Sequence, residues 1–156
     1  MRKDRFGQMK CFVYAFRGII YTVKTERNMR IHLCVAFYVI LAGVVTGIGL
    51  TEWAAVLICI ALVLGSECLN TAVETACNAI HPGNSLKVAR VKDIAAGSVL
   101  IFAAVSAVVG GIIFFRTEKV ASTVEFAVTH PVAAGAIVLT LPLWIYFIFF
   151  SRKLKK

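Results

Sequence analysis

The chain has 156 residues, of which 60% are hydrophobic, and a formal net charge of +9. This composition excludes an ordinary soluble domain, and the length leaves room for one compact membrane domain. The basic residues flank apolar stretches and form no patch with interleaved aromatic residues, so the charge indicates membrane orientation and no nucleic-acid partner. Five scattered cysteines without a CxxC pair are interpreted as small apolar side chains, not as a zinc site.

Residues 1–25 are expected to form a helix on the membrane surface. Apolar residues recur there at steps of three and four, and basic residues recur every seven on another face. This pattern predicts an amphipathic helix lying on an anionic leaflet. A helix packed on a partner is the alternative interpretation.

Four apolar segments follow, each long enough to cross the hydrocarbon core of a bilayer. We predict membrane spans at residues 31–50, 53–77, 94–115 and 126–150. Between them we expect a tight turn at Thr51–Glu52, a break at 81–84 that leads into a polar stretch at 85–92, and a polar loop at 116–125. The predicted fold is therefore an all-α membrane protein, a surface helix plus four transmembrane helices, in a single domain over residues 1–156.

The distribution of Lys and Arg predicts the orientation in the membrane. Eight basic residues precede Ile31, three lie in 81–92 and four follow Phe150. The other two connections hold none and two. Because basic residues accumulate on the cytoplasmic side, we expect both termini and the 81–92 loop to be cytoplasmic.

Two carboxylates stand inside the second predicted span. Glu67 and Glu74 are seven residues apart, about two helical turns, so they share one helix face with Asn70 between them. An acidic side chain costs about 2.5–3.5 kcal/mol at the centre of a membrane helix. Their presence therefore points to a functional site. An interhelical hydrogen-bonding pair that serves assembly only is the alternative.

The predicted topology brings Glu26, Lys92 and Asp93 to the same side of the membrane as these carboxylates. Two carboxylates with substrate phosphates are a typical Mg²⁺ environment, and a lysine can neutralise charge on a transferring phosphoryl group. A deeper carboxylate can accept a proton from a hydroxyl that arrives within the lipid. Taken alone, Lys92 and Asp93 also fit the ordinary start of a helix.

Four segments together resemble the prokaryotic diacylglycerol kinase family, which includes the undecaprenol kinases of Gram-positive bacteria. They are FRG (16–18), ERN (26–28), ECLNTAVE (67–74) and KDIAAGSVL (92–100). The resemblance covers about residues 10–115, so it includes a three-span core at 31–115 and leaves the span at 126–150 outside. It implies a homotrimeric kinase of the bacterial plasma membrane that uses Mg²⁺ and transfers the γ-phosphate of ATP to a lipid alcohol.

The resemblance also implies roles for individual residues. Glu67 is expected to be the general base at the lipid hydroxyl, and the catalytic set is Glu67, Asn70 and Lys92. The expected metal ligands are Glu26 and Glu74. The residues expected to contact ATP are Tyr14, Glu26, Glu74, Gly83, Asn84, Ser85, Lys92 and Asp93, and those expected to contact the lipid are Asn28, Arg30, His32 and Glu67.

Three positions depart from the pattern of the resembled family. Asn78 stands where the family commonly carries Asp, and Ser85 stands where it usually carries His. Gly7 lacks the basic side chain of many members, for which Arg5 could substitute. The carboxylates and the lysine of the motifs are all present, so we expect an active enzyme.

The identity of the lipid and the class of function leave alternatives open. The sequence NTAVE at 70–74, in place of NSAIE, favours undecaprenol over diacylglycerol as the phosphate acceptor. The alternative function is a small proton-coupled transporter that uses the membrane carboxylates, and a purely structural scaffold is a further one. The transporter interpretation leaves the cluster of Glu26, Lys92 and Asp93 unexplained.

Overall fold

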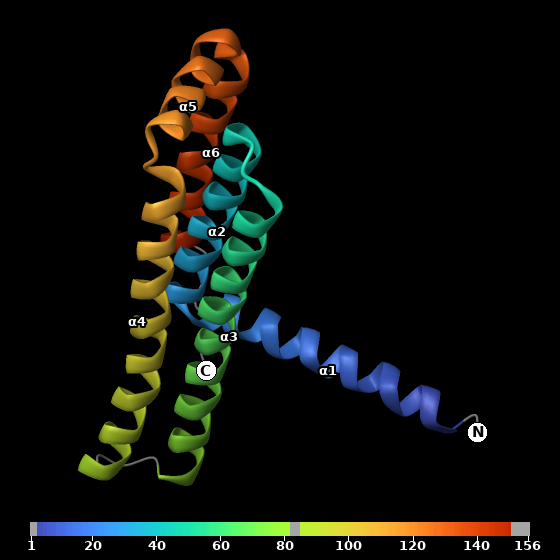
Figure 1. Cartoon of the computed structure of the whole chain (residues 1–156). Coiled ribbons are helices and arrows are strands. Elements are labelled where there is room, and N and C mark those ends of the chain that lie inside the picture. Colours follow the sequence, from blue (N-terminus) through green and yellow to red (C-terminus); the bar gives the residue numbers. More distant parts are fainter. Residues whose placement is uncertain (1–2, 82–84, 151–156) are drawn as a thin grey trace.

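The computed structural model describes residues 3–81 and 85–150, which form α-helices and contain no strand (Figure 1). The helices are α1 (Lys3–Thr25), α2 (Arg27–Thr46), α3 (Leu50–Ile80), α4 (Leu86–Phe114), α5 (Thr117–Thr129) and α6 (Pro131–Phe150). The all-α prediction is confirmed. Helices α2, α3, α4 and α6 are long and apolar enough to cross a membrane, which confirms the four predicted spans.

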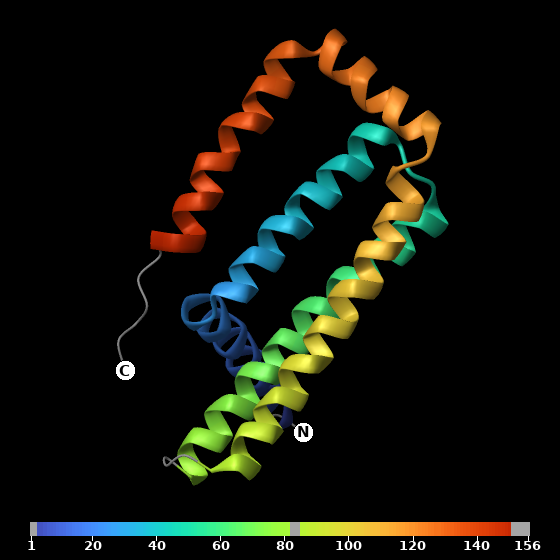
Figure 2. The same cartoon turned by 90° about the vertical axis from the view of Figure 1, so that its left-hand side faces the viewer.

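The helix bundle is built around an antiparallel hairpin of α3 and α4. Helix α2 packs against α3, and α6 lies beside α2 on the side away from α4 (Figure 2). Helix α1 leaves the bundle at a steep angle near the middle of α3 (Figure 1). With 31 and 29 residues, α3 and α4 are about 46 and 43 Å long, whereas the hydrocarbon core is about 30 Å thick. Part of the hairpin therefore extends beyond the bilayer core.

The connection between α2 and α3 lies earlier than predicted. Gly47 ends α2 in the left-handed conformation, with a φ of 59°, and its turn is closed by two backbone hydrogen bonds to the preceding helical turn. The Glu52 carboxylate then accepts a hydrogen bond of 2.9 Å from the Gly49 N–H. The predicted turn at Thr51–Glu52 is therefore wrong, because Glu52 caps the start of α3 from within its first turn.

The polar stretch predicted as a connection at 85–92 is helical from Leu86 onward, so the helix of the third span begins eight residues before residue 94. The sequence analysis interpreted this stretch as a connection between two helices because its residues are polar. Because the hairpin is longer than the bilayer is thick, polar helical turns can face water beyond the core.

The predicted polar loop at 116–125 is also wrong, because α5 occupies most of it. The fourth span begins at Pro131 and not at residue 126. Proline suits the first helical position, and it disfavours helical geometry at the preceding residue, His130. The chain therefore breaks there into two helices.

Helix α5 and the residue before it contact the C-terminal end of α2 and the N-terminal end of α3. The Lys119 ammonium donates hydrogen bonds of 3.1 Å to the carbonyls of Thr46 and Gly47, at the negative end of the α2 dipole. The Arg116 guanidinium forms an ion pair of 2.9 Å with Glu52. These contacts tie the C-terminal helices to the turn between the first two spans.

Helix α6 docks along α2 through side chains. The hydroxyls of Tyr38 and Thr140 are hydrogen-bonded at 2.7 Å, and the rings of Phe37 and Trp144 lie 5.6 Å apart. Because lipid offers these hydroxyls no alternative hydrogen-bond partner, the Tyr38–Thr140 bond links α2 and α6 specifically.

We predict that Tyr38→Phe and Thr140→Val each destabilise the solubilised protein by about 1 kcal/mol, because each breaks the same interhelical bond. The double variant should cost about as much as either single one, since the bond can be lost only once. Unfolding followed in mixed micelles measures this coupling. Thr123→Val is the control, because its hydroxyl donates only to the Lys119 carbonyl in its own helix. Additive losses would contradict the prediction.

Candidate active site

Glu67 is the most deeply buried large side chain among the described residues. It lies in the middle of α3 and is 1% exposed. Its Oε2 atom has no hydrogen-bond partner in the described structure, nor has the Oδ1 atom of the neighbouring Asn70. A buried polar atom without a partner is costly. These two atoms therefore lack the hydrogen-bond partner that a buried polar atom normally has.

A cavity of about 270 Å³ contains both side chains. Helix α2 contributes Asn28 and His32 to its wall, and helix α4 closes it with small and apolar residues. The structure thus brings Asn28, His32, Glu67 and Asn70 together in the wall of one cavity, and their predicted roles stay predictions. The α4 wall, which the sequence analysis missed, consists of Ala96, Val99, Leu100 and Ala103.

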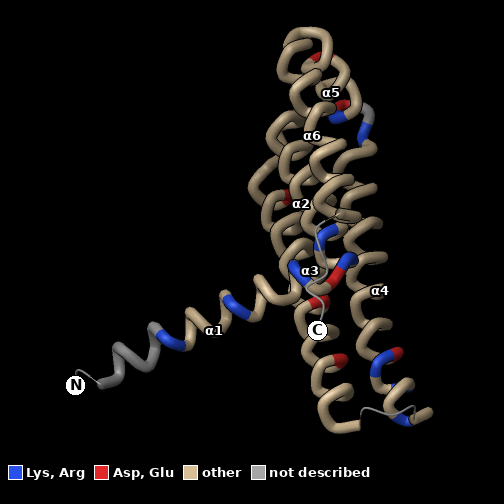
Figure 3. Tube along the Cα trace, turned by 180° about the vertical axis from the view of Figure 1, so that it is seen from behind, with Lys and Arg blue, Asp and Glu red and all other residues tan. Residues whose placement is uncertain are grey.

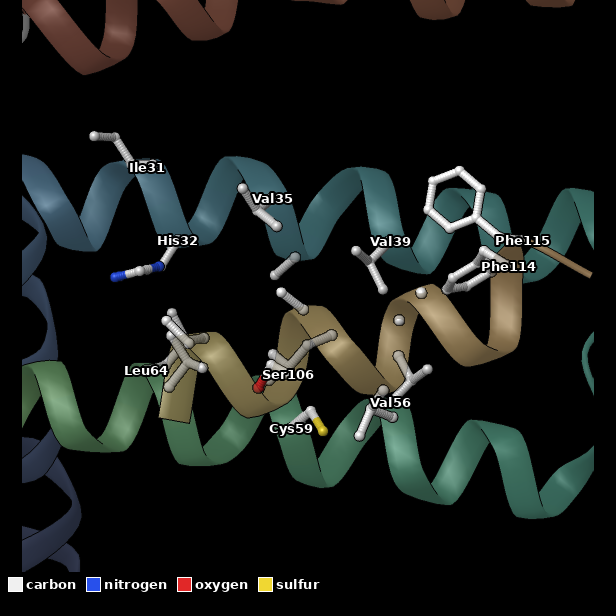
Figure 4. Close-up of a pocket in the computed structure, with 18 residues that line it drawn as sticks. Ile31, His32, Val35, Val39, Val56, Cys59, Leu64, Ser106, Phe114 and Phe115 are labelled. Atoms are coloured by element: carbon white, nitrogen blue, oxygen red, sulfur yellow. The ribbon is translucent and has the colours of Figure 1, made fainter. Parts of the chain in front are cut away.

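A larger apolar groove of about 480 Å³ adjoins this cavity (Figure 4). The two share Ile31, His32 and Ala103 in their walls, and the groove continues between α2, α3 and α4 as far as Phe114 and Phe115. The signal for the α4 wall is present in the sequence as a stripe of small residues at helical spacing, namely Ala96, Ala103, Ala107, Gly110 and Gly111. A buried carboxylate thus stands at one end of a slot lined by hydrocarbon.

The other predicted carboxylates lie near Glu67. The charges of Glu26 and Glu74 are both within electrostatic range of the Glu67 carboxylate. Glu74 also accepts a hydrogen bond of 3.4 Å from the Asn70 amide. Figure 3 shows acidic and basic residues gathered where α1 meets the bundle and toward the α3–α4 loop. The helices thus collect negative charge on one face of α3.

No three His, Cys, Asp or Glu side chains converge into a metal site in the described part of the chain. Mg²⁺ does not require such a cage, because it is commonly held by one or two carboxylates together with substrate phosphates and water. The pair of Glu26 and Glu74 fits that donor set. The unpartnered oxygens of Glu67 and Asn70 are of the same hard type.

Lys92 lies on the second turn of α4 and does not line the cavity at Glu67. Its ammonium donates a hydrogen bond of 2.6 Å to the Asn78 side-chain oxygen on α3. Asp93 follows it and is exposed. Both residues belong to the N-terminal turns of α4. Asn78, noted in the sequence only as a departure, proves to be the contact of the expected phosphate-binding lysine.

Two predicted site residues are placed elsewhere in this single chain. Arg30 is buried, and its guanidinium donates to the carbonyls of Val23 and Lys24, so it holds the end of α1. Tyr14 is 62% exposed on α1 and lies twelve residues before Glu26, about 18 Å along a helix. Their predicted lipid and nucleotide contacts remain predictions.

The structure describes only part of the loop that was predicted to contact the nucleotide. Gly83 and Asn84 lie outside the described residues. Ser85 immediately precedes α4 and is half-buried. The substituted position Gly7 lies on α1, toward its free end.

Comparison with known proteins identifies the chain. The family model of prokaryotic diacylglycerol kinase matches residues 13–114. The undecaprenol kinase of Bacillus subtilis (strain 168) is 36% identical over 105 residues, which are 67% of this chain and 85% of that protein. The diacylglycerol kinase of Synechocystis sp. (strain ATCC 27184 / PCC 6803 / Kazusa) is 35% identical over 101 residues, 64% of this chain and 58% of that protein. No solved structure matches significantly.

The matched region runs from the second half of α1 to the end of α4 and contains every residue that lines the cavity at Glu67. Helices α5 and α6 lie outside it. Both relatives are kinases that act on an alcohol group, and the match to the family covers most of the chain. The chain is therefore an enzyme of the phosphotransferase class and belongs to the prokaryotic diacylglycerol kinase family.

Proposed function

We propose that the protein transfers the γ-phosphate of ATP, with Mg²⁺, to the hydroxyl of a membrane lipid alcohol, and that undecaprenol is preferred over diacylglycerol. The observation that carries the proposal is the buried Glu67 with an unpartnered carboxylate oxygen, in a cavity that adjoins a long apolar groove. A lipid alcohol fits this arrangement, because its hydroxyl can reach the carboxylate while its tail stays in hydrocarbon.

In the proposed reaction Glu67 accepts the proton of the lipid hydroxyl. The hydroxyl oxygen forms a bond to the γ-phosphorus, the bond between that phosphorus and the β–γ bridging oxygen breaks, and ADP leaves. Asn70 orients the reacting groups from the same wall of the cavity. Its amide nitrogen already donates to Glu74, and its side-chain oxygen has no partner in the described structure.

The phosphates are proposed to lie between the cavity and the end of the hairpin, where Lys92 and Asp93 occur. Lys92 contributes positive charge to the transferring phosphoryl group. Glu26 and Glu74 are the proposed Mg²⁺ ligands, and bound Mg²⁺ neutralises charge on the phosphates. The first turns of α4, to which Lys92 belongs, extend past the start of α2 (Figure 1), and we propose that water-soluble ATP reaches this end of the hairpin.

The membrane placement follows from the same geometry. Helix α1 is proposed to lie on the cytoplasmic surface, since it leaves the bundle where α2 begins (Figure 1). The buried Glu67 then lies just below the surface, and the polar end of the hairpin is in the cytoplasm of a bacterial cell. Both termini are cytoplasmic in this arrangement, which agrees with the count of basic residues.

We propose a homotrimer from the resemblance to the family. The position of Tyr14 supports an assembly of more than one copy of the chain. Its distance along α1 from Glu26 prevents it from serving the site of its own chain. In an assembly it can serve the site of a neighbour, so that nucleotide contacts are shared between copies.

The transporter alternative is not favoured. It requires membrane carboxylates that meet an aqueous path, whereas Glu67 faces a cavity continued by an apolar groove. It also gives no role to the Lys92 and Asp93 end of the hairpin, and both curated relatives are named as kinases.

We predict that Glu67→Gln lowers kcat by a factor of about 10² to 10⁴, the usual contribution of a general base. The variant keeps the shape of the side chain, so the KM for ATP should change little. Phosphate transfer from radiolabelled ATP to solubilised undecaprenol measures both constants. Glu125→Gln on the exposed surface of α5 is the matched control and should retain full activity. A wild-type kcat in folded Glu67→Gln protein would rule out the assignment of the base.

We predict that Gly110→Leu raises the KM for a long-chain alcohol by about tenfold, because the new side chain fills the groove. A side chain at Gly110 meets no atom within 4 Å at its Cβ, so the backbone can accept it. Gly110 lies seven residues beyond Ala103, about 10 Å farther from Glu67 along α4. Geraniol, whose tail is short, should therefore keep its KM.

The control for this change is Gly135→Leu on α6, where an added Cβ also meets open space and no groove is lined. It should leave both alcohols unaffected. An equal loss for geraniol and the long-chain alcohol in Gly110→Leu would show that the groove does not hold the tail.

The choice of lipid is tested by competition. Undecaprenol and diacylglycerol at equal mole fraction in the same mixed micelles compete for radiolabelled ATP. We expect undecaprenyl phosphate to accumulate faster, since one slot next to Glu67 suits a single-tailed alcohol and the undecaprenol kinase of B. subtilis is similar over more of its length. Faster formation of phosphatidic acid would reverse the preference without affecting the proposed kinase activity.

A further inference from the structure

Arg30 is a buried cation at the corner where α1 meets α2. It is 2% exposed, and its Nη1 atom donates hydrogen bonds of 3.4 and 3.2 Å to the carbonyls of Val23 and Lys24. A buried charge is costly unless it is paired, yet no carboxylate in the described part of the chain forms an ion pair with Arg30. The cation is therefore held by backbone carbonyls and not by an acid.

These carbonyls belong to the C-terminal end of α1. The last four carbonyls of a helix have no partner within it, and they carry the negative end of the helix dipole. In α1 the Glu26 N–H donates a hydrogen bond of 2.8 Å to the Thr22 carbonyl, and Arg30 donates to the next two. A side chain from the first turn of α2 thus caps the end of α1 and links the two helices across the corner.

Glu26 is the residue between the two helices. Its backbone is extended, with a φ of −101° and a ψ of 122°, and its side chain makes no capping hydrogen bond to α2. The Glu26 carboxylate is therefore not used to cap the helix, and its charge acts on the Glu67 carboxylate. Because a single residue makes the turn, the angle between α1 and α2 decides where the Glu26 carboxylate points.

Packing of α1 on α3 does not fix this angle by itself. A cleft of about 540 Å³ lies between the two helices, lined mainly by small side chains such as Gly18, Ala72 and Ala76. Helix α1 has 23 residues, about 35 Å, and leaves the bundle at a steep angle (Figure 1). By contrast, Thr22 and Met29 at the corner are 3% and 2% exposed. The tightly packed corner, with the Arg30 contacts inside it, therefore sets the direction of α1.

Arg30 does not line the proposed substrate site. Its neighbours Ile31 and His32 line both the cavity at Glu67 and the apolar groove, whereas Arg30 lines neither. The contacts of Arg30 therefore favour an indirect role over the lipid contact that the resemblance implies. The lipid contact is the alternative that an experiment has to separate.

We propose that Arg30 is a positioning residue for the metal site: by capping α1 it fixes the corner so that the Glu26 carboxylate is held toward Glu67 and Glu74, ready to bind Mg²⁺. The inference rests on the proposed function, because it takes Glu26 as a metal ligand. Removing a group that orients a metal-binding side chain typically lowers metal affinity by about 10- to 100-fold.

The test measures metal binding separately from turnover. The Mn²⁺ complex of β,γ-methylene-ATP is titrated into the full-length protein in mixed micelles, and electron paramagnetic resonance follows the bound Mn²⁺. Arg30→Gln should weaken this binding by about tenfold and raise the Mg²⁺ concentration for half-maximal activity to match. Arg30→Lys keeps the charge and hydrogen-bond donors, so it should recover part of the affinity. The KM for the lipid alcohol should stay unchanged in both variants.

Arg27→Gln is the matched control. Arg27 lies at the same corner but is exposed, and its guanidinium lies 5.5 Å from the centre of the Phe149 ring. The control therefore removes the same charge without breaking the contacts to α1, and it should bind the Mn²⁺ complex as the natural protein does. A double variant tests the route through Glu26. Once Glu26→Gln has removed the ligand, adding Arg30→Gln should cause no further loss of Mn²⁺ binding, because the two changes act on one ligand.

Unchanged Mn²⁺ binding in folded Arg30→Gln protein overturns the proposal, and so does a rise of the lipid KM alone, which would show a lipid contact. Additive losses in the double variant, or an equal loss in Arg27→Gln, also overturn it, since the effect would then be general. If neither Arg30 variant gives folded protein by circular dichroism and gel filtration, Arg30 serves the fold as a whole and the positioning role is overturned. If the natural protein neither binds the Mn²⁺ complex nor phosphorylates a lipid alcohol, the proposed function fails instead.

Discussion

A carboxylate buried inside a membrane helix, with an oxygen that has no partner, is the constraint on which the rest of this structure depends. Burying Glu67 in hydrocarbon is unfavourable by itself, and the surrounding helices do little to offset the cost. They supply a cavity with polar groups on one side and an apolar groove on the other. The arrangement makes sense as a place where a polar group of a lipid is handled, since the missing partner arrives with the substrate.

The helices outside the family match support the site indirectly. Helix α2 provides one wall of the groove and has Glu26 and Asn28 at its start, and within the hairpin it packs mainly against α3. Helices α5 and α6 contact the C-terminal end of α2 and its middle, through Lys119 and through Tyr38 and Phe37. They thus fix α2 from the side opposite the groove, which leaves the groove itself free for lipid.

Much of the fold could be predicted from the sequence because the bilayer imposes simple rules. Long apolar segments, the basic residues between them and the spacing of Glu67, Asn70 and Glu74 all follow from helix geometry and the cost of charge in lipid. The errors arose at polar segments. The 85–92 stretch and the 116–125 segment were interpreted as connections because they are polar, but each is helical where it projects from the bilayer or caps its neighbour.

The sequence by itself determined the all-helical membrane class, the family and the set of acidic and amide residues that make the site, because these depend on local periodicity and on motifs. Only the tertiary structure decided which of them meet. Asn28 and His32 line the same cavity as Glu67, whereas the Arg30 guanidinium donates to a carbonyl at the end of α1. The Lys92 ammonium donates to the Asn78 side chain. The reason is physical: helix packing sets the distance between side chains that are far apart in sequence, and no periodicity within one helix contains that information.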